Sequence, residues 1–183
     1  MSDASPLSSE YDTSSPSEGF INGPSYFTSR IIFMANINFN DECVHVNFLG
    51  LPNVPGIAAE IFSALSERSV SVNMVTQNSM RGGRSDLSFL IRRDTLDEMI
   101  RVCREIAEHV GAQGVSFATE VAAITVELKS PSDAAHTLAK IFSALASVNV
   151  NIEIINSTSE SVICIVSSTK AHEGLDALMK AFK

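Results

Sequence analysis

Apolar side chains recur along the chain with a period that changes between two residues and nearly four. Residues 43–50 alternate apolar and polar positions, a pattern typical of a strand with one buried face. After a loop that contains two prolines and a glycine, Ile57, Ile61 and Leu65 recur at the spacing that places them on one side of a helix. The pattern therefore predicts short strands and amphipathic helices that follow one another.

Turn and cap residues set the limits of these segments. Gly82 and Gly83 favour a tight hairpin turn, and Asp94 or Thr95 is a candidate cap for a helix that Gly111 ends. In the first part of the chain we expect helices over residues 57–65 and 96–110, and strands over residues 30–40, 43–50, 71–78, 85–91 and 115–119. In the second part we expect helices over residues 133–148 and 172–182, and strands over residues 122–128, 150–157 and 162–168.

A five-residue sequence that occurs twice shows how these segments are organised. Residues 61–65 recur letter for letter as residues 141–145, and the β-branched, Asn-rich stretches that follow stay in register at the same offset of eighty residues. A helix-to-strand unit of roughly fifteen positions in register indicates a duplicated module. The first module has the order strand, helix, strand, strand, helix, strand, which is the ferredoxin-like plan with an antiparallel sheet, and the second repeats this order as far as its last helix. We therefore expect an α+β protein of two such modules in tandem.

The repeat divides the chain into three segments. Residues 1–29 form a Ser- and Pro-rich leader that cannot bury enough apolar surface to order itself. Residues 30–120 form the first module and residues 121–183 the second. The second module has no closing strand after its last helix, whereas the first has a surplus strand before its own first one. We therefore expect residues 30–40 to cross over and close the second sheet.

Charge and cysteine content exclude several functions. A net charge of −8 opposes binding to nucleic acid or to an anionic membrane, and no apolar run reaches the length of a membrane span. Cys43, Cys103 and Cys164 form no CxxC pair and lie in apolar runs, as buried thiols of a reducing cytoplasm do. The four histidines form no catalytic triad or metal-ligand spacing. We therefore expect no catalytic residues, no metal and no cofactor.

Several stretches resemble the regulatory region of aspartokinases. In the first module these are residues 51–59, 61–65, 72–78 and 85–89. In the second module they are residues 149–155 and 157–160, and the resemblance as a whole covers about residues 35 to 183. The sequence is similar to tandem ACT modules, and in particular to the separate regulatory subunit that some aspartokinases possess.

This resemblance implies an allosteric protein that binds lysine or threonine at a seam between modules or between two chains. It also implies a homodimer whose modules pack sheet against sheet, with a catalytic aspartokinase subunit as a candidate partner. The phosphate loop of the kinase part is missing, because Gly82 and Gly83 are better explained by a hairpin turn. We therefore expect a cytoplasmic regulatory protein and not an enzyme.

The first effector site follows from the resemblance and from the chemistry of an amino acid. A loop that runs into a helix N-terminus offers free backbone N–H groups to a carboxylate, and a glutamine amide both donates and accepts. The resemblance places the site on Asn53, Gly56, Ile57, Ala58 and Gln77. Where the family usually has aspartate this chain has Asn53. A charge-assisted hydrogen bond contributes about 1.5–3 kcal/mol against about 1 for a neutral one, so we expect weaker binding or a different ligand.

A second effector site is implied in the second module. The resemblance places it on Asn149, Asn151, Ile152, Ser159 and Glu160. Here Ala135 and His136 replace the Pro-Gly step of the first module, and Asp133 stands at the position of Asn53. The second site therefore departs further from the family pattern than the first.

Two other functions remain open from the sequence. One is an enzyme derived from an ACT pair, which works in the seam with His136 or Asp133 as the base. The other is an interaction module that has lost ligand binding and docks through its Ser-rich leader. Turnover that is lost on His136→Ala, with no partner protein present, would support the enzyme. A partner bound equally well with and without amino acids would support the interaction module.

Overall fold

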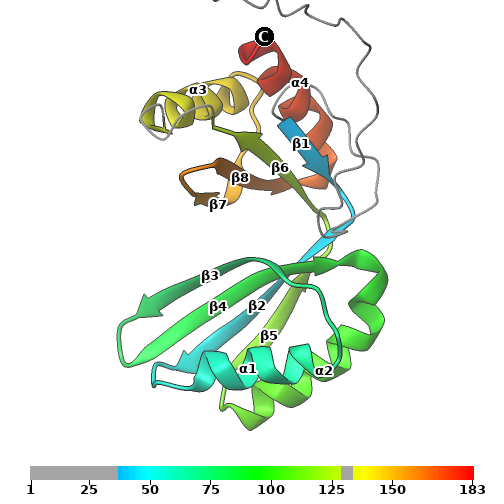
Figure 1. Ribbon diagram of the computed structural model, residues 1–183, viewed down its shortest axis with the longest axis vertical. Coiled ribbons are helices and arrows are strands. Elements are labelled where there is room, and N and C mark those ends of the chain that lie inside the picture. Colours follow the sequence, from blue (N-terminus) through cyan, green and yellow to red (C-terminus); the bar gives the residue numbers. More distant parts are fainter. Residues whose placement is uncertain (1–36, 129–133) are drawn as a thin grey trace, which may run out of the picture.

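The computed structural model describes residues 37–128 and 134–183 and shows two modules, each with one sheet and two helices (Figure 1). The first module contains β2 (Cys43–Pro52), α1 (Ile57–Ser66), β3 (Asn73–Met80), β4 (Arg84–Arg92), α2 (Leu96–His109) and β5 (Gly114–Ala118). The second contains β1 (Ile37–Asn40), β6 (Val121–Glu127), α3 (Ala134–Ser147), β7 (Ile152–Ser157), β8 (Ser161–Ser167) and α4 (Ala171–Ala181). Short 3₁₀ turns lead into α2 and α4.

Both sheets are antiparallel and four-stranded. The strand order is β3-β4-β2-β5 in the first sheet and β1-β6-β8-β7 in the second. One face of each sheet is covered by helices, α1 and α2 in the first module and α3 and α4 in the second (Figure 1). This arrangement confirms the predicted α+β class and the two ferredoxin-like modules in tandem.

The short strand β1 belongs to the second sheet although it directly precedes β2 of the first. It pairs antiparallel with β6, with Phe39 opposite Ile124. The Phe39 side chain is buried in the core of the second module, and its ring centroid lies 5.0 Å from that of His172 at the start of α4. The exchange of a closing strand is therefore confirmed for residues 37–40. Residues 30–36 of the expected strand and the leader lie outside the described residues.

The repeated five-residue sequence has the same role in both cores. Its first and last side chains are buried against their own sheets, namely Ile61, Leu65, Ile141 and Leu145. Each such aliphatic side chain contributes about 1.5–3 kcal/mol relative to leaving it exposed. The second position of the repeat differs, because Phe62 packs on Phe89 with 5.7 Å between ring centroids, whereas Phe142 is 44% exposed. The two modules thus bury the same positions of the repeat, but the phenylalanine at its second position is packed in the first module and exposed in the second.

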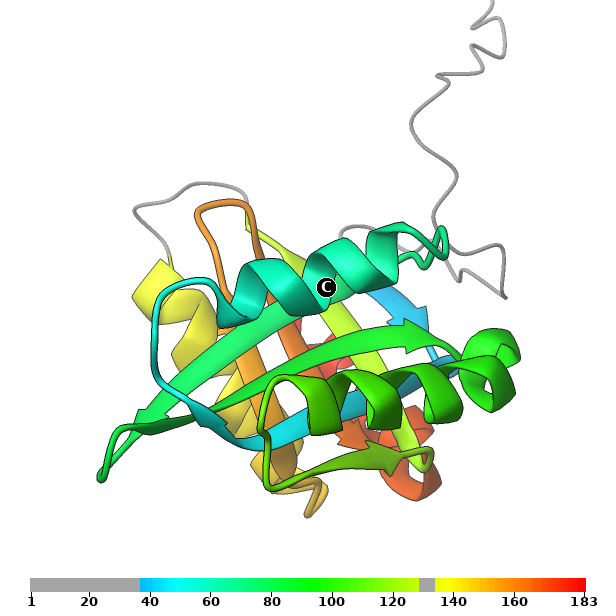
Figure 2. The same ribbon diagram turned by 90° about the horizontal axis from the view of Figure 1, so that it is seen from below.

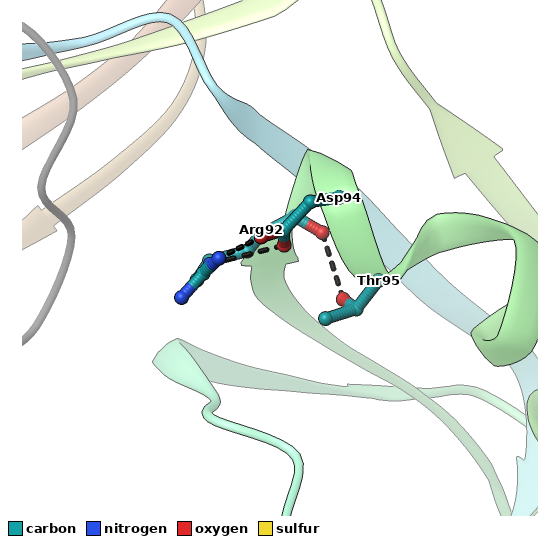
Figure 3. A network of polar contacts seen from close by, with 3 residues as sticks. All are labelled: Arg92, Asp94 and Thr95. Carbon is teal, nitrogen blue, oxygen red and sulfur yellow. Dashed lines mark hydrogen bonds and ion pairs between the residues drawn. The ribbon is translucent and has the colours of Figure 1, made fainter.

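The start of α2 differs from the predicted cap. Asp94 forms an ion pair with Arg92, and Thr95 Oγ1 donates to the Arg92 carbonyl oxygen at 2.8 Å (Figure 3). Within the described chain no side-chain bond caps α2 at Thr95, because both residues lie in a 3₁₀ turn ahead of the helix. The predicted end is confirmed, since Gly111 adopts a φ of 69° directly after the last turn.

The two sheets face each other, and the helices lie on the outer sides of both (Figures 1 and 2). Where the sheets meet, buried side chains from the faces opposite the helices form an inter-sheet cluster of Cys43, Leu90, Val121, Ala123 and Ile165. Partly buried apolar side chains surround this cluster, namely Met74, Ala118, Ile154 and Ile163. Each module therefore has its own core, and both share a third one.

The two chain connections between the modules are held by one arginine. They are residues 41–42, between β1 and β2, and residues 119–120, between β5 and β6. Arg93 Nη2 donates to the carbonyl oxygen of Asp41 at 3.1 Å and to that of Thr119 at 2.6 Å. A single guanidinium thus bonds to both connections, and it restrains the junction at which the sheets meet.

Phe39→Ala is expected to loosen the second module more than the first. The Phe39 side chain is 5% exposed and lies in the second core, and Phe→Ala in a core costs about 3–5 kcal/mol. Hydrogen exchange followed by mass spectrometry should therefore be faster in β6 and β8 than in β4. Phe48→Ala makes the same change in the first core and should show the reverse. Equal acceleration of both sheets by Phe39→Ala would contradict the role of β1.

Candidate functional site

A cavity of about 430 Å³ opens beside the loop that joins β2 to α1. Its walls come from this loop with the start of α1, from β3 and from β4. The lining residues are Leu51, Pro52, Asn53, Val54, Pro55, Gly56, Ile57, Ala58, Gln77, Ser85 and Leu87. The structure thus brings together the five residues predicted for the first effector site, which are Asn53, Gly56, Ile57, Ala58 and Gln77.

A bulge in β2 turns the chain into this loop. The register of β2 against β4 shifts between Phe48 and Leu51, and Gly50 inside the shift has a φ of 58°. This backbone conformation favours glycine, and a Cβ at this position would lie 2.4 Å from Gln113 Oε1. Because a bulge changes the direction of a strand, Leu51 and Pro52 reach the cavity wall.

Two charged side chains of β4 hold the bulge from the other face of the sheet. The Gly50 N–H donates to Asp86 Oδ1 at 2.7 Å. Arg84 Nη1 donates to the Gly50 carbonyl at 2.7 Å and to the Gly111 carbonyl at 3.2 Å. Since side chains alternate along a strand, Ser85 points the opposite way and lines the cavity. One strand therefore braces the loop with one face and forms the cavity wall with the other.

Helix α1 begins at the cavity with backbone donors that the helix does not use. Gly56 precedes it with a φ of 103°, and in the described chain no side chain caps this end. The Glu60 N–H bonds to the Gly56 carbonyl at 3.0 Å, while the amides of residues 57–59 have no partner inside the helix. These amides and the positive end of the helix dipole favour a carboxylate at this position.

The side chains around the cavity are neutral. Gln77 Nε2 lies 3.5 Å from Ser85 Oγ, and Ser85 is only 1% exposed. The Asn53 backbone is fixed because its N–H donates to the Gly83 carbonyl at 2.9 Å. Among the described lining residues none is acidic or basic. A charged ligand would therefore meet amides, hydroxyl and carbonyl groups here and no opposite charge.

Sequence reasoning missed six lining residues of the cavity. Four of them lie in the predicted loop or directly before it, namely Leu51, Pro52, Val54 and Pro55. The other two, Ser85 and Leu87, lie on β4. Both follow from the pairing of β3 with β4, which sets Gln77 opposite Leu87 and Ser79 opposite Ser85. The sequence signal for this pairing is the turn at Gly82, because counting outward from a hairpin turn gives the cross-strand partners. A register built from that turn would have added Ser85 to the candidate site.

The residues predicted for the second site lie at both ends of β7. They are Asn149, Asn151, Ile152, Ser159 and Glu160. The first three lie before the strand or at its start, and the last two lie in the turn after it. A strand of six residues spans roughly 20 Å. Within one chain, the structure therefore does not bring these two groups together.

Local contacts explain where these residues lie. Asn149 follows α3 with a φ of 55°, and its carbonyl accepts a hydrogen bond from Lys170 Nζ at 3.0 Å. In the turn after β7, Thr158 Oγ1 accepts from the Glu160 amide at 3.1 Å. The candidate base His136 is exposed in the first turn of α3. Residues 129–133, which include the other candidate base, lie outside the described residues.

Thiols and metal ligands do not form a site in the described chain. Burial raises the pKa of Cys43 and Cys164 to about 11 and that of Cys103 to about 12, so these thiols are protonated and weakly nucleophilic at neutral pH. Residues 37–128 and 134–183 contain no group of three or more His, Cys, Asp or Glu placed to hold a metal ion. None of the described helices is long and apolar enough to cross a membrane.

The sequence of the chain is similar to those of known proteins. The aspartate kinase of Pseudomonas fluorescens is 29% identical over 151 residues, which are 82% of this chain and 36% of that enzyme. The chain therefore spans about a third of the length of the curated relatives it matches. The family model of the ACT domain matches residues 46–106 and 133–182, one segment in each module.

Two solved structures show the same fold over most of the chain. The ligand-free regulatory subunit of aspartate kinase from Thermus thermophilus has a TM-score of 0.74 and 25% identity, and covers 81% of this chain and 98% of that one. A structure of aspartokinase alpha and beta subunits has a TM-score of 0.73 and 25% identity, and covers 81% and 97%. Together with the family model in both modules, this shows that the chain belongs to the ACT domain family.

Proposed function

We propose that the protein is a regulatory protein of the aspartokinase type that binds a free amino acid, threonine or lysine, in its first module. The observation that carries this proposal is the cavity at the start of α1, where uncapped amides and neutral polar side chains surround one space. The similarity to the regulatory subunit from Thermus thermophilus supports it. Because that relative is a regulatory subunit, the proposed role is regulatory and not catalytic.

The groups around the cavity fit the two ends of an amino acid. The amides of residues 57–59 donate hydrogen bonds to the carboxylate, and the side-chain carbonyl oxygens of Asn53 and Gln77 accept hydrogen bonds from the ammonium. A lysine ligand carries a second ammonium, for which the described lining offers no carboxylate. Threonine has a small neutral side chain whose hydroxyl needs only a neutral partner such as Ser85. The geometry therefore favours threonine over lysine.

A second copy of the chain is proposed to cover the open side of the cavity. In the described chain β3 is an edge strand, and it exposes Val75 and Met80 by 47% and 43%. Val54 on the cavity rim is 56% exposed. An unpaired strand edge and exposed apolar side chains both favour association. A homodimer joined along β3 would shield the ligand from water and strengthen its hydrogen bonds.

A catalytic aspartokinase subunit is the proposed partner. The solved structure of aspartokinase alpha and beta subunits supports this choice, because its matched chain resembles 81% of this chain. Bound amino acid would stabilise one packing of the two modules, and the partner would respond to that packing by population shift. A ligand that binds one packing tenfold more tightly shifts this equilibrium by about 1.4 kcal/mol.

The melting temperature of the purified chain, measured with each of the twenty amino acids and with aspartate-pathway intermediates, tests the function. A ligand that binds only the folded state stabilises it by about 2.7 kcal/mol at a hundred times its Kd. We expect threonine to raise the melting temperature, and lysine to raise it less. A panel in which no compound raises it would contradict the proposal and favour an interaction module.

Gln77→Ala is expected to weaken threonine binding about fivefold, because it removes a neutral hydrogen bond of about 1 kcal/mol. The matched control is Asn78→Ala, since Asn78 is also exposed on β3 but pairs with Asp86 and does not line the cavity. Calorimetric titration should give a Kd for the control within about twofold of the unmodified chain. Equal Kd values for the two variants would remove Gln77 from the site.

Arg84→Met is expected to lower both stability and threonine affinity. It leaves the Gly50 carbonyl without its guanidinium partner, which lowers the free energy of unfolding by about 1–3 kcal/mol. It also frees the bulge that positions the cavity loop. Arg84→Lys should restore part of the affinity, because it keeps one charged donor. The control is Arg92→Met, which removes an exposed ion pair with Asp94 worth about 0–1 kcal/mol. If Arg84→Met leaves the Kd for threonine unchanged, the Arg84 hydrogen bonds do not position the site.

A further inference from the structure

Strand β3 connects the cavity with the contact between the modules. Towards one end of the strand Gln77 lines the cavity. Three residues earlier, Met74 packs against the inter-sheet cluster, to which Ile165 and Ala123 of the second module belong. One short strand therefore reaches both the proposed ligand site and the cluster that the two modules share.

A bulge directs Met74 towards the second module. The register of β3 against β4 shifts between Asn73 and Thr76, and Met74 inside the shift has a φ of 48°. Residues other than glycine rarely adopt this left-handed conformation, although a side chain that is unbranched at Cβ tolerates it better than a branched one. Such strain persists only where the surroundings impose it. At Met74 those surroundings are the apolar side chains of the inter-sheet cluster.

The second module contains a related arrangement. Ile154 lies eighty residues after Met74, and the register of β7 against β8 shifts between Ile152 and Ile154. Ile154 packs on the same inter-sheet cluster. Among the described residues Met74 has a positive φ and Ile154 does not, which agrees with the branching of isoleucine at Cβ. Two equivalent strands thus meet at one apolar cluster, and the strand of the first module leads to the cavity.

The strand segment between Met74 and Gln77 is held from one side of the strand. Thr76 Oγ1 lies 2.7 Å from Ser88 Oγ, and Ser88 is 8% exposed. Because β3 is an edge strand, β4 is its one strand partner within the described chain. Pairing with β4 sets Gln77 opposite Leu87, and the packing of Met74 and the bond from Thr76 hold the segment of β3 that directly precedes Gln77.

We propose that Met74 is a positioning residue that couples the cavity to the second module by acting on Gln77 through β3. The inference rests on the proposed function, because its consequence is regulation of that same site. Coupling between two sites is reciprocal. A ligand held by Gln77 favours the packing in which Met74 lies against the inter-sheet cluster, and the second-module side chains of that cluster raise the affinity for the ligand.

The test compares two identical changes in the second module, Ile165→Ala and Ile124→Ala. Both side chains are fully buried, but Ile165 lies in the inter-sheet cluster and Ile124 in the core under α3 and α4. Met74→Ala is the third variant. The corresponding Ile→Val variants replace the Ile→Ala pair if either protein does not fold. Each variant is titrated with threonine by calorimetry, and hydrogen exchange of residues 73–77 is measured without ligand.

Met74→Ala and Ile165→Ala are expected to weaken threonine binding about fivefold, at the lower end of couplings between sites. Both should also speed amide exchange in β3, whereas Ile124→Ala should change neither quantity once global stability is taken into account. Equal affinities and equal β3 exchange in the two isoleucine variants would overturn the coupling. If the unmodified chain binds no amino acid, the proposed function fails, and the exchange rates alone decide whether Met74 links β3 to the second module.

Discussion

The exchange of β1 into the second sheet constrains the arrangement of the whole molecule. Because β1 directly precedes β2, its pairing with β6 fixes the place at which the two sheets meet. The chain returns to the second module between β5 and β6, and Arg93 donates to a carbonyl of each connection. Two crossings and a shared apolar cluster leave the modules far fewer relative orientations than one flexible linker would. A structural change in one module therefore acts on the other through these connections and the shared cluster.

The cavity loop and Met74 both lie where the first sheet departs from regular pairing. The bulge at Gly50 turns β2 out of the sheet and into the cavity loop. The bulge around Met74 turns a side chain of β3 away from its regular position and into the contact between the sheets. Regular strands at these positions would continue their alternation and would form neither feature. The ferredoxin-like plan is thus a scaffold, and these two irregularities form the proposed ligand site and the proposed coupling between the modules.

These irregularities also mark the limit of what the sequence can predict. The strands, the helices and the exchange of β1 follow from hydrophobic periodicity and from counting the strands of a repeat, so they were predicted. The five cavity residues came from a resemblance to a family and not from periodicity. The contributions of Ser85 and Met74 depend on register, and a bulge shifts the register by one residue without changing the hydrophobic pattern. The predicted side-chain cap at Asp94 or Thr95 does not form, because Asp94 pairs with Arg92 and the Thr95 hydroxyl donates to the Arg92 carbonyl.

Duplication preserved the core of the module but not the start of its first helix. At the repeat offset, His136 stands where the first module has Gly56, and it lies inside the first turn of α3 instead of ahead of it. The φ of 103° that Gly56 adopts is accessible to glycine and strongly disfavoured for histidine. The second module therefore cannot copy that helix start, while Ile154 retains the contact with the inter-sheet cluster. Under the proposed function, the coupling between the modules therefore runs through this cluster, to which β3 of the first module and β7 of the second both contribute apolar side chains.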